Sequence, residues 1–358
     1  MLPPRLCPPA TMLMHACAAT VCLLCTYMHA VRDNDINIMK IPRPIHLLLD
    51  WDGTLTCKDT LSLVGSIAYY ANSDKSLPPW STFVDGWMTD YTDHANRYEP
   101  ITSARTTLDQ ERQWLASLAP IENTSVHRVE SSGIFKRVKA SHVDHIAASS
   151  IKSGDLQLRN HWHLLFHTLL SNPSNKIGIL SVNWSARFIR QSLLSASSNL
   201  ASPENESLTS YIRTMDIEAN EISNLEHTDG SDGRLSKHSS TGIRTSADKL
   251  LRLPLRCQRK LDKSISASEA TEQEEDIVIY IGDSATDLEA LLAADVGICI
   301  RDDPMGSSQK ELSDTLQRIG VKIQNIDEGI DTKQKTNHVV YLTQDFDQVA
   351  KALAGLGL

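Results

Sequence analysis

The sequence predicts an α/β protein with a three-layer core, in which helices cover both faces of a parallel sheet. Three short apolar runs lead to this prediction: residues 45–49 (IHLLL), 176–182 (KIGILSV) and 276–281 (DIVIYI). Strands that are apolar along their whole length are typical of parallel sheets buried on both faces. Each run ends in polar residues, and ligands of such sheets bind beyond the carboxyl ends of the strands. We therefore expect the functional residues to lie together where the three runs end.

The composition is that of a globular protein and excludes several functional classes. The 358 residues are 41% apolar and 22% charged, which suffices for a core domain with a smaller one. Because 35 basic residues stand against 44 acidic ones, nucleic acid is not expected as a partner. Four of the seven cysteines lie in the first 25 residues and three are scattered, which fits a reducing, cytoplasmic compartment better than a disulfide framework.

Residues 1–38 form a weakly apolar N-terminal extension with two interpretations. Residues 1–31 contain a mostly apolar stretch, interrupted by His15 and His29, that fits a targeting signal or membrane anchor. Alternatively, the domain begins at Met39, which opens the compact phrase MKIPRPIHLLLDWDGTLT. We favour the second interpretation and do not expect membrane association.

Residues 57–175 are expected to form a mainly α-helical cap inserted after the first strand. Their apolar side chains recur at helical spacing, and no strand alternation is present. The core is then assembled from residues 39–56 and 176–358. Ser, Asn, Glu and Gly dominate near 195–245 and 264–275, so polar insertions in the core are expected there.

Asp50 and Asp52 stand at the end of the first apolar run. The two-residue period of an extended chain puts both side chains on one side. Two neighbouring carboxylates can divide labour: Asp50 ionises and attacks, while Asp52, held partly protonated, protonates a leaving group and then activates water. Gly53 permits close backbone approach to a phosphate, and Thr54 supplies a hydroxyl. The alternative is an ordinary Asp-Gly turn.

A second acidic pair, Asp283 and Asp287, follows the third run in GDSATDLEALLAADVGI. If the chain is helical from Ser284, carboxylates four residues apart face the same way. Carboxylate oxygens from different strand ends are the ligands that Mg²⁺ requires. The alternative is that both side chains serve the start of a helix as caps and dipole partners.

Ser181 and Lys249 are the candidate phosphate ligands outside the acidic pairs. Ser181 ends the second run directly before a helix expected from Ser185 or Ala186, where a hydroxyl and free amides make an anion site. The alternative is a helix N-cap. Lys249 lies midway between the second and third runs and can screen the paired carboxylates, unless it is an ordinary surface lysine.

Taken in chain order, DxDGT, Ser, Lys and GDxxxD resemble the haloacid dehalogenase-like (HAD) superfamily. The phrases LLLDWDGTLT, LSVNWS, IEANEI and YIGDSATDLEALLAADVGI carry the resemblance, which spans residues 45–300. Within the superfamily the chain is similar to the phosphoserine phosphatase-like branch, to small fungal members and to the plant thiamine-monophosphate phosphatase domain. The resemblance implies a Rossmann-like core and a helical cap over the active site.

The resemblance also implies a Mg²⁺-dependent phosphatase that acts on a small phosphorylated metabolite. Asp50 is implied to form an aspartyl-phosphate and to be a metal ligand. Asp52 is implied to act as acid and base and to lend its backbone carbonyl to the metal ion. Asp283 is implied to be a metal ligand, with Asp287 supporting the metal site. The implied phosphate-binding residues are Thr54, Ser181 and Lys249.

Two rival functions stay open on the sequence alone. A phosphomutase uses the same first motif but returns the phosphoryl group to its substrate. A catalytically silent regulatory or binding protein shares the fold, although such a protein has no physical reason to keep two repelling carboxylates together. Trp80, Trp87 and Trp114 of the cap are interpreted as core residues, with the alternative that an aromatic ring closes over a substrate.

Overall fold

The computed structural model describes residues 43–72, 76–200, 205–236, 242–262, 276–331 and 339–355. The N-terminal stretch with two interpretations, residues 1–38, lies outside the described residues, as does the polar segment at 264–275. Within these ranges, every helix is too short or too polar to cross a membrane.

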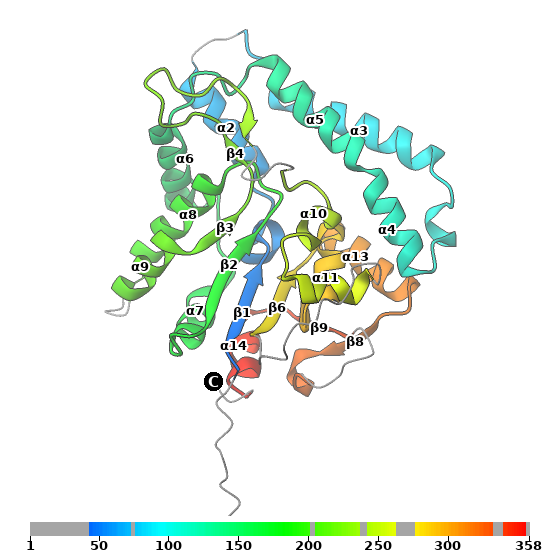
Figure 1. The fold of residues 1–358 in the computed structure, drawn as a ribbon. Coiled ribbons are helices and arrows are strands. Elements are labelled where there is room, and N and C mark those ends of the chain that lie inside the picture. The colour runs from blue at the N-terminus through cyan, green and yellow to red at the C-terminus, as the bar shows by residue number, and fades with distance from the viewer. Residues whose placement is uncertain are drawn as a thin grey trace, which may run out of the picture. The chain divides into compact units, whose positions relative to one another are not determined.

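The core is a seven-stranded parallel sheet with the strand order β3-β2-β1-β6-β7-β9-β8 (Figure 1). The three predicted apolar runs form its neighbouring central strands, with Leu49 of β1 opposite Ile179 of β2 and Ile281 of β6. The predicted α/β fold with a parallel sheet is therefore confirmed. The strands are β1 (Ile45–Leu49), β2 (Lys176–Leu180), β3 (Asp216–Glu218), β6 (Ile277–Gly282), β7 (Val296–Ile300), β8 (Lys322–Asn325) and β9 (Val339–Thr343).

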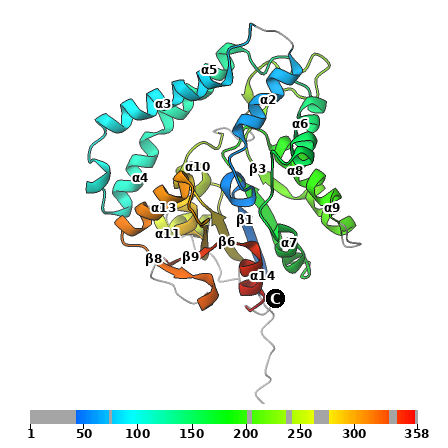
Figure 2. The same cartoon turned by 180° about the vertical axis from the view of Figure 1, so that it is seen from behind.

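Helices cover both faces of the sheet because the strands are apolar on both sides. Leu47 and Leu49 of β1 belong to one apolar cluster, while Leu48 between them belongs to a second. The first cluster includes side chains of α7 (Trp162–Leu170), α8 (Ala186–Ser198), α9 (Asn205–Thr214) and α14 (Phe346–Ala354), and Figure 2 shows α7 beside α14. The second includes side chains of α10 (Ser246–Leu250), α11 (Leu255–Leu261), α12 (Leu288–Ala293) and α13 (Ser307–Arg318).

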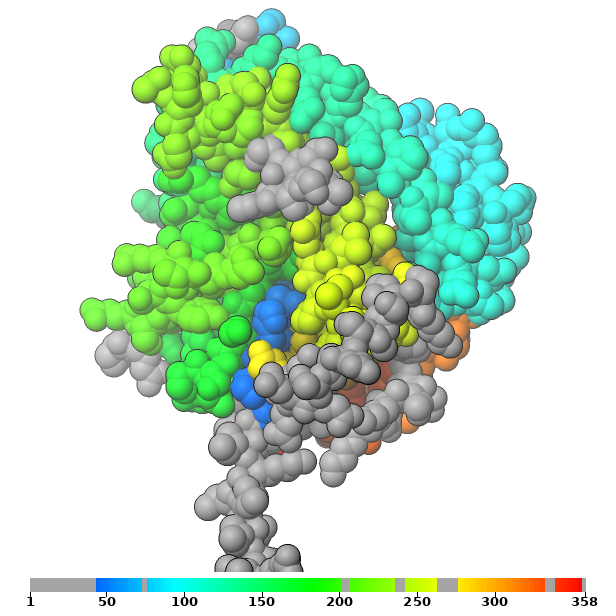
Figure 3. Space-filling view, viewed as in Figure 1, coloured from blue at the N-terminus to red at the C-terminus, as the bar shows by residue number. Residues whose placement is uncertain are grey.

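Helices also dominate the segment between β1 and β2. They are α2 (Leu61–Ala71), α3 (Trp80–Arg97), α4 (Leu108–Ser117), α5 (Ala119–Ser132) and α6 (Ala140–Ser153), followed by α7. α6 packs against α8 and α2, whereas α3, α4 and α5 form an arm drawn in cyan and teal (Figures 1 and 3). Two helix ends in the arm have recognisable capping residues. Thr107 and Gln110 form a capping box at the start of α4, and Gly133, with φ of 68°, ends α5.

Two ion pairs tie α4 of the arm to the sheet-covering helices. Arg112 Nε lies 2.6 Å from Glu289 Oε1 of α12, and Arg318 Nη2 of α13 lies 2.8 Å from Glu111 Oε2. Glu289 and Glu111 are both buried, so each carboxylate needs its arginine.

The polar segment 195–245 contributes a strand to the sheet and makes a contact with α6. It contains α9, the sheet strand β3 and a small antiparallel pair, β4 (Glu221–Ile222) and β5 (Leu235–Ser236). The loop between β4 and β5 bonds to the start of α6, where the Ala140 amide donates to the Leu225 carbonyl at 3.0 Å.

Candidate active site

Three polar side chains predicted from the sequence follow three neighbouring strands. Asp50 comes directly after β1, Ser181 after β2 and Asp283 after β6. Because the strands are parallel, their carboxyl ends meet at one edge of the sheet. The Asp50 amide continues the ladder by donating to the Ile281 carbonyl at 2.9 Å, which fixes where the Asp50 side chain begins.

Asp50, Asp283 and Asp287 form a buried acidic cluster around Lys249. Each aspartate offers an oxygen within 4.8 Å of the others, and each is at most 3% exposed. Lys249 Nζ lies 2.8 Å from Asp50 Oδ1 and 2.6 Å from Asp287 Oδ1. The ammonium group reaches the cluster from α10, whose first turn is set by a capping box of Thr245 and Asp248.

The cluster holds more negative charge than one lysine can balance. Burial and the neighbouring charge of Asp287 raise the pKa of Asp50 well above its usual value, and they raise the pKa of Asp283 to about 7. Burial acts in the same sense on Asp287, but Lys249 and several hydrogen bonds outweigh it and lower its pKa. When ionised, three carboxylates around one ammonium leave two negative charges uncompensated.

The donor set fits a divalent metal ion. Carboxylate oxygens are hard ligands, and a doubly charged cation would match the uncompensated charge. Although Lys249 lies close to Asp50 Oδ1, no described residue gives that buried oxygen a well-aligned hydrogen bond. Gly53 leaves room for Asp283, because a Cβ at Gly53 would lie 2.5 Å from Asp283 Oδ2, and its φ of +73° also favours glycine.

Asp287 is occupied as an organiser of the cluster. Its Oδ1 accepts hydrogen bonds at 2.6 Å from both Lys249 Nζ and the buried Tyr280 hydroxyl. Its Oδ2 accepts from the Asp283 amide and from the amide and hydroxyl of Ser284, at 3.0 to 3.1 Å. These bonds use the lone pairs of both oxygens, so Asp50 and Asp283 are the better placed metal ligands. The predicted helical turn at Ser284 is a short turn, Ala285–Asp287, before α12.

The carboxyl group of Asp52 lies outside the acidic cluster and is held by hydrogen bonds. Its Oδ1 accepts from the Thr60 amide at 2.7 Å and the Thr60 hydroxyl at 2.6 Å, and its Oδ2 accepts from Asn183 Nδ2 at 2.9 Å. Burial and the charge of Asp59 raise the pKa of Asp52 to about 6, while the bonds from Asn183 and Thr60 act against the rise. A fixed carboxyl group with this pKa suits proton transfer near neutral pH.

Thr54 and Ser181 are both buried at this edge of the sheet. The Thr54 hydroxyl donates to Asp283 Oδ1 at 2.9 Å, so in this structure it orients a candidate metal ligand. The Ser181 hydroxyl accepts from the Asn183 amide at 3.1 Å. The N-cap of α8 is Ser185, whose hydroxyl accepts from the Phe188 amide at 3.1 Å, so Ser181 does not serve as that cap.

Arg159 supports the site, although no sequence motif points to it. Its Nε donates to the Thr54 carbonyl at 2.9 Å, and its Nη2 donates to the Gly53 carbonyl at 2.8 Å. The guanidinium also pairs with Asp302, which follows β7. Arg159 thus fixes the turn after Asp50 from a position more than 100 residues away in sequence, where no local motif marks it. Thr60 and Asn183, which hold Asp52, are not among the predicted site residues either. Asn183 does stand inside the LSVNWS phrase at a strand end, which is a signal for it in the sequence.

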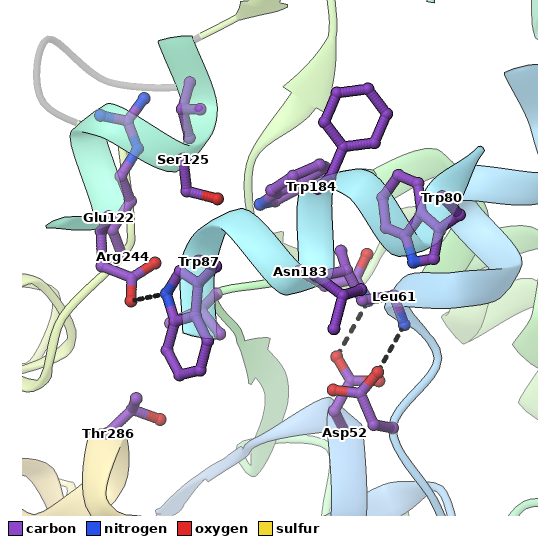
Figure 4. A pocket seen from close by; sticks show the side chains of 15 residues that line it. Asp52, Leu61, Trp80, Trp87, Glu122, Ser125, Asn183, Trp184, Arg244 and Thr286 are labelled. Carbon is purple, nitrogen blue, oxygen red and sulfur yellow. Dashed lines mark hydrogen bonds between the residues drawn. The ribbon is translucent and has the colours of Figure 1, made fainter. Parts of the chain in front are cut away.

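A pocket of about 310 Å³ opens beside Asp52, between the core and the helices α3 and α5 (Figure 4). Trp80 and Trp87 line it, whereas Trp114 is buried in an aromatic group with Tyr98 and Arg105. The pocket therefore links the candidate acid to the aromatic side chains of the arm.

No family model matches this chain. A CTO1 family protein of the fungus Schizosaccharomyces pombe is 24% identical over 309 residues, which cover 85% of this chain and 98% of that protein.

Solved structures with similar features carry the names of phosphatases and hydrolases. A substrate-bound phosphoserine phosphatase matches with a TM-score of 0.39 and 10% identity, covering 86% of this chain and 98% of the other. A HAD family hydrolase from Salmonella enterica serovar Typhi matches with a TM-score of 0.37 and 14% identity, covering 75% of this chain and 66% of the other.

Proposed function

We propose that the chain is a HAD-like, Mg²⁺-dependent phosphatase that hydrolyses a small phosphorylated metabolite through an aspartyl-phosphate on Asp50. The observation that carries the proposal is the convergence of Asp50, Asp283 and Lys249 in one buried cluster beside a separately held Asp52. A nucleophile, a metal ligand, a phosphate-binding cation and an acid then stand at one edge of the sheet.

In the first step, an oxygen of the Asp50 carboxylate attacks phosphorus while the bond from phosphorus to the ester oxygen breaks. Asp52 donates its proton to the departing alcohol oxygen, and the Asp52 pKa of about 6 keeps part of the enzyme in the required protonated form near neutral pH. Lys249 opposes the rise in the pKa of Asp50, which favours the ionised nucleophile, and it offers positive charge to the phosphoryl oxygens.

In the second step, the Asp52 carboxylate takes a proton from water as the water oxygen attacks phosphorus. The bond from phosphorus to Asp50 breaks, which restores the Asp50 carboxylate and releases inorganic phosphate. When bound, Mg²⁺ supplies charge that offsets repulsion between the phosphate and the aspartates. Asp50 and Asp283, with the Asp52 backbone carbonyl, are the proposed ligands, while Thr54 and Ser181 are proposed to contact the phosphate.

Hydrolysis of p-nitrophenyl phosphate by the full chain tests the proposal. We expect turnover with Mg²⁺, none with EDTA, and a loss of at least about 10³-fold in Asp50→Asn, because the nucleophile is removed. Asp314→Asn, which removes one exposed carboxylate on α13, is the control and should keep wild-type activity.

Two outcomes of this assay would decide against the proposal. Equal rates in wild type and Asp50→Asn would favour a catalytically silent protein with contaminating activity. Inorganic phosphate released in less than stoichiometric amount with a natural ester, with transfer to a second alcohol position, would favour a phosphomutase.

A further inference from the structure

An acid that protonates the leaving group lies next to the alcohol part of the substrate. On the proposed function, the pocket beside Asp52 therefore binds that alcohol part. Asp52 and Asn183 line its floor from the core, and Thr286 lies at its edge (Figure 4). Residues of α3 and α5 line the remaining walls. A phosphate ester bound at Asp50 therefore extends its alcohol part toward the arm.

Aromatic rings form much of the wall of this pocket. Trp80, Trp87 and Trp184 are arranged around the open space in Figure 4, and Phe83 lies next to Trp80 with ring centroids 5.7 Å apart. Trp80 and Trp184 meet edge to face at 5.9 Å, so the rings are held in place by one another. Aromatic faces carry partial negative charge and attract cations as well as apolar groups.

The ionisable groups that line the pocket are mostly acidic. Among the described lining residues, Asp52, Asp59 and Glu122 stand against Arg244 as the basic side chain. Arg244 Nη1 donates to Asn123 Oδ1, so the guanidinium is partly engaged away from the lining residues. Even with Asp52 protonated as the proposed acid, Asp59 and Glu122 stand against Arg244. The pocket is therefore acidic next to the proposed phosphate site, which is the reverse of what a wholly anionic substrate requires.

Glu122 is the acidic group that the arm itself contributes. Its Oε1 accepts a hydrogen bond from Trp87 Nε1 at 2.9 Å, which orients the carboxylate and the indole together. The Trp87 indole also stacks on Tyr91, with ring centroids 5.1 Å apart. Burial raises the pKa of Glu122, against the effects of the Trp87 bond and the Arg244 charge. A cation beside the carboxylate would offset this cost of burial.

From these observations we propose that the substrate is a phosphate monoester whose alcohol part carries a positively charged nitrogen. Glu122 and the rings of Trp80, Trp87 and Trp184 bind this cation, while the acidic cluster below binds the phosphate. The negative pocket and the phosphate site then select opposite ends of one zwitterionic molecule.

A matched pair of esters tests this selectivity directly. Choline phosphate carries a quaternary ammonium group, and 3,3-dimethylbutyl phosphate has the same shape with carbon in place of the charged nitrogen. For the full chain with Mg²⁺, we expect kcat/KM to be at least about tenfold higher for the cationic ester. The difference should lie mainly in KM, because the cation is bound equally before and during the reaction.

The results for the wild-type protein distinguish failure of the proposed cation pocket from failure of the proposed phosphatase function. Equal kcat/KM values, or a preference for the neutral ester, would overturn the cation pocket and leave the phosphatase intact. Hydrolysis of p-nitrophenyl phosphate without hydrolysis of either ester would also overturn the cation pocket alone. Absence of hydrolysis of all three compounds would instead defeat the proposed function.

Glu122→Gln assigns the selectivity to one residue. Glutamine keeps the shape of the side chain and can still accept the Trp87 hydrogen bond, but it lacks the charge. We expect the ratio of kcat/KM for the two esters to fall toward one. Asp314→Asn loses one exposed negative charge on α13 and should keep the wild-type ratio. An unchanged ratio in Glu122→Gln would remove Glu122 from the proposal.

Discussion

The acidic cluster and the aromatic pocket adjoin each other but are assembled by different means. Asp50 and Asp283 follow strands directly, and Asp287 stands in the next turn, so the sheet backbone fixes all three. The pocket side chains instead come from the faces of α3 and α5 and from the residues after β2. Under the proposed function, backbone geometry determines the kind of reaction, whereas helix packing determines which alcohol part fits.

The two regions also differ in burial and in openness to solvent. The cluster is buried and contains a tightly paired lysine, whereas the pocket is partly open and lined by rings. Substitutions in the cluster should accordingly change stability and rate together. Substitutions of the polar pocket residue Glu122 should change selectivity and leave stability nearly unaffected.

Asp52→Asn should have the largest effect among variants that keep the acidic cluster intact. Loss of a general acid and base lowers the rate by about 10²- to 10⁴-fold. Because p-nitrophenol departs without a proton, we expect a burst of one p-nitrophenolate per enzyme followed by slow turnover, visible in stopped-flow absorbance. Wild-type turnover of p-nitrophenyl phosphate in Asp52→Asn would remove Asp52 from the second step.

Lys249→Met should show that the cluster is a structural element as well as a site. The substitution leaves Asp50 and Asp287 buried without their ammonium partner, which costs about 3–5 kcal/mol. In metal-free protein at pH 8 we expect the Tm to fall by on the order of 10 °C in a thermal melt. Lys260→Met is the control, since its pair with Asp295 lies at the surface and contributes below about 1 kcal/mol. Equal changes in Tm for the two variants would contradict the contrast.

Metal-free protein should lose stability as the pH rises from 5 to 8. The pKa of Asp283 is about 7 when folded and 3.8 in its unperturbed state, so folding favours the protonated form. That contribution is fully present below the unperturbed pKa and is lost as the pH rises through about 7. We expect a falling Tm across this window in EDTA, a smaller fall in Asp283→Asn, and a smaller fall with saturating Mg²⁺. A Tm that rises from pH 5 to 8 in EDTA would contradict the raised pKa of Asp283 in the folded protein.

The contrast between the two regions also explains what could be predicted from the sequence. The three strands and the positions of Asp50 and Asp283 follow from local patterns, namely apolar runs that end in acidic residues. Lys249 is also predicted from the sequence, because its place between the second and third strands matches the motif order. The strand β3 was not expected, because a three-residue edge strand inside a polar segment has no periodicity to detect.

Other parts of the site depend on contacts that no local pattern encodes. Arg159 bonds to the carbonyls of Gly53 and Thr54 across more than 100 residues, and Glu122 meets Trp87 only because α3 packs against α5. Such partners are selected by tertiary packing, and a single sequence does not reveal them. Trp80 packs against the core as predicted, and both Trp80 and Trp87 also line the pocket, which agrees with the alternative of a ring beside a ligand.

Trp87→Phe should have the smallest effect on substrate preference. This variant tests whether the charge of Glu122, rather than ring packing alone, makes the pocket selective. Phenylalanine keeps an aromatic ring beside Tyr91 but removes the hydrogen bond to Glu122. Because that bond opposes the rise in the Glu122 pKa, its loss should raise this pKa further. We expect a few-fold lower preference for choline phosphate over its neutral analogue at pH 6, which recovers as the pH rises and Glu122 ionises again. If the rings alone made the pocket selective, the preference would instead stay constant between pH 6 and 9, because no carboxylate would titrate.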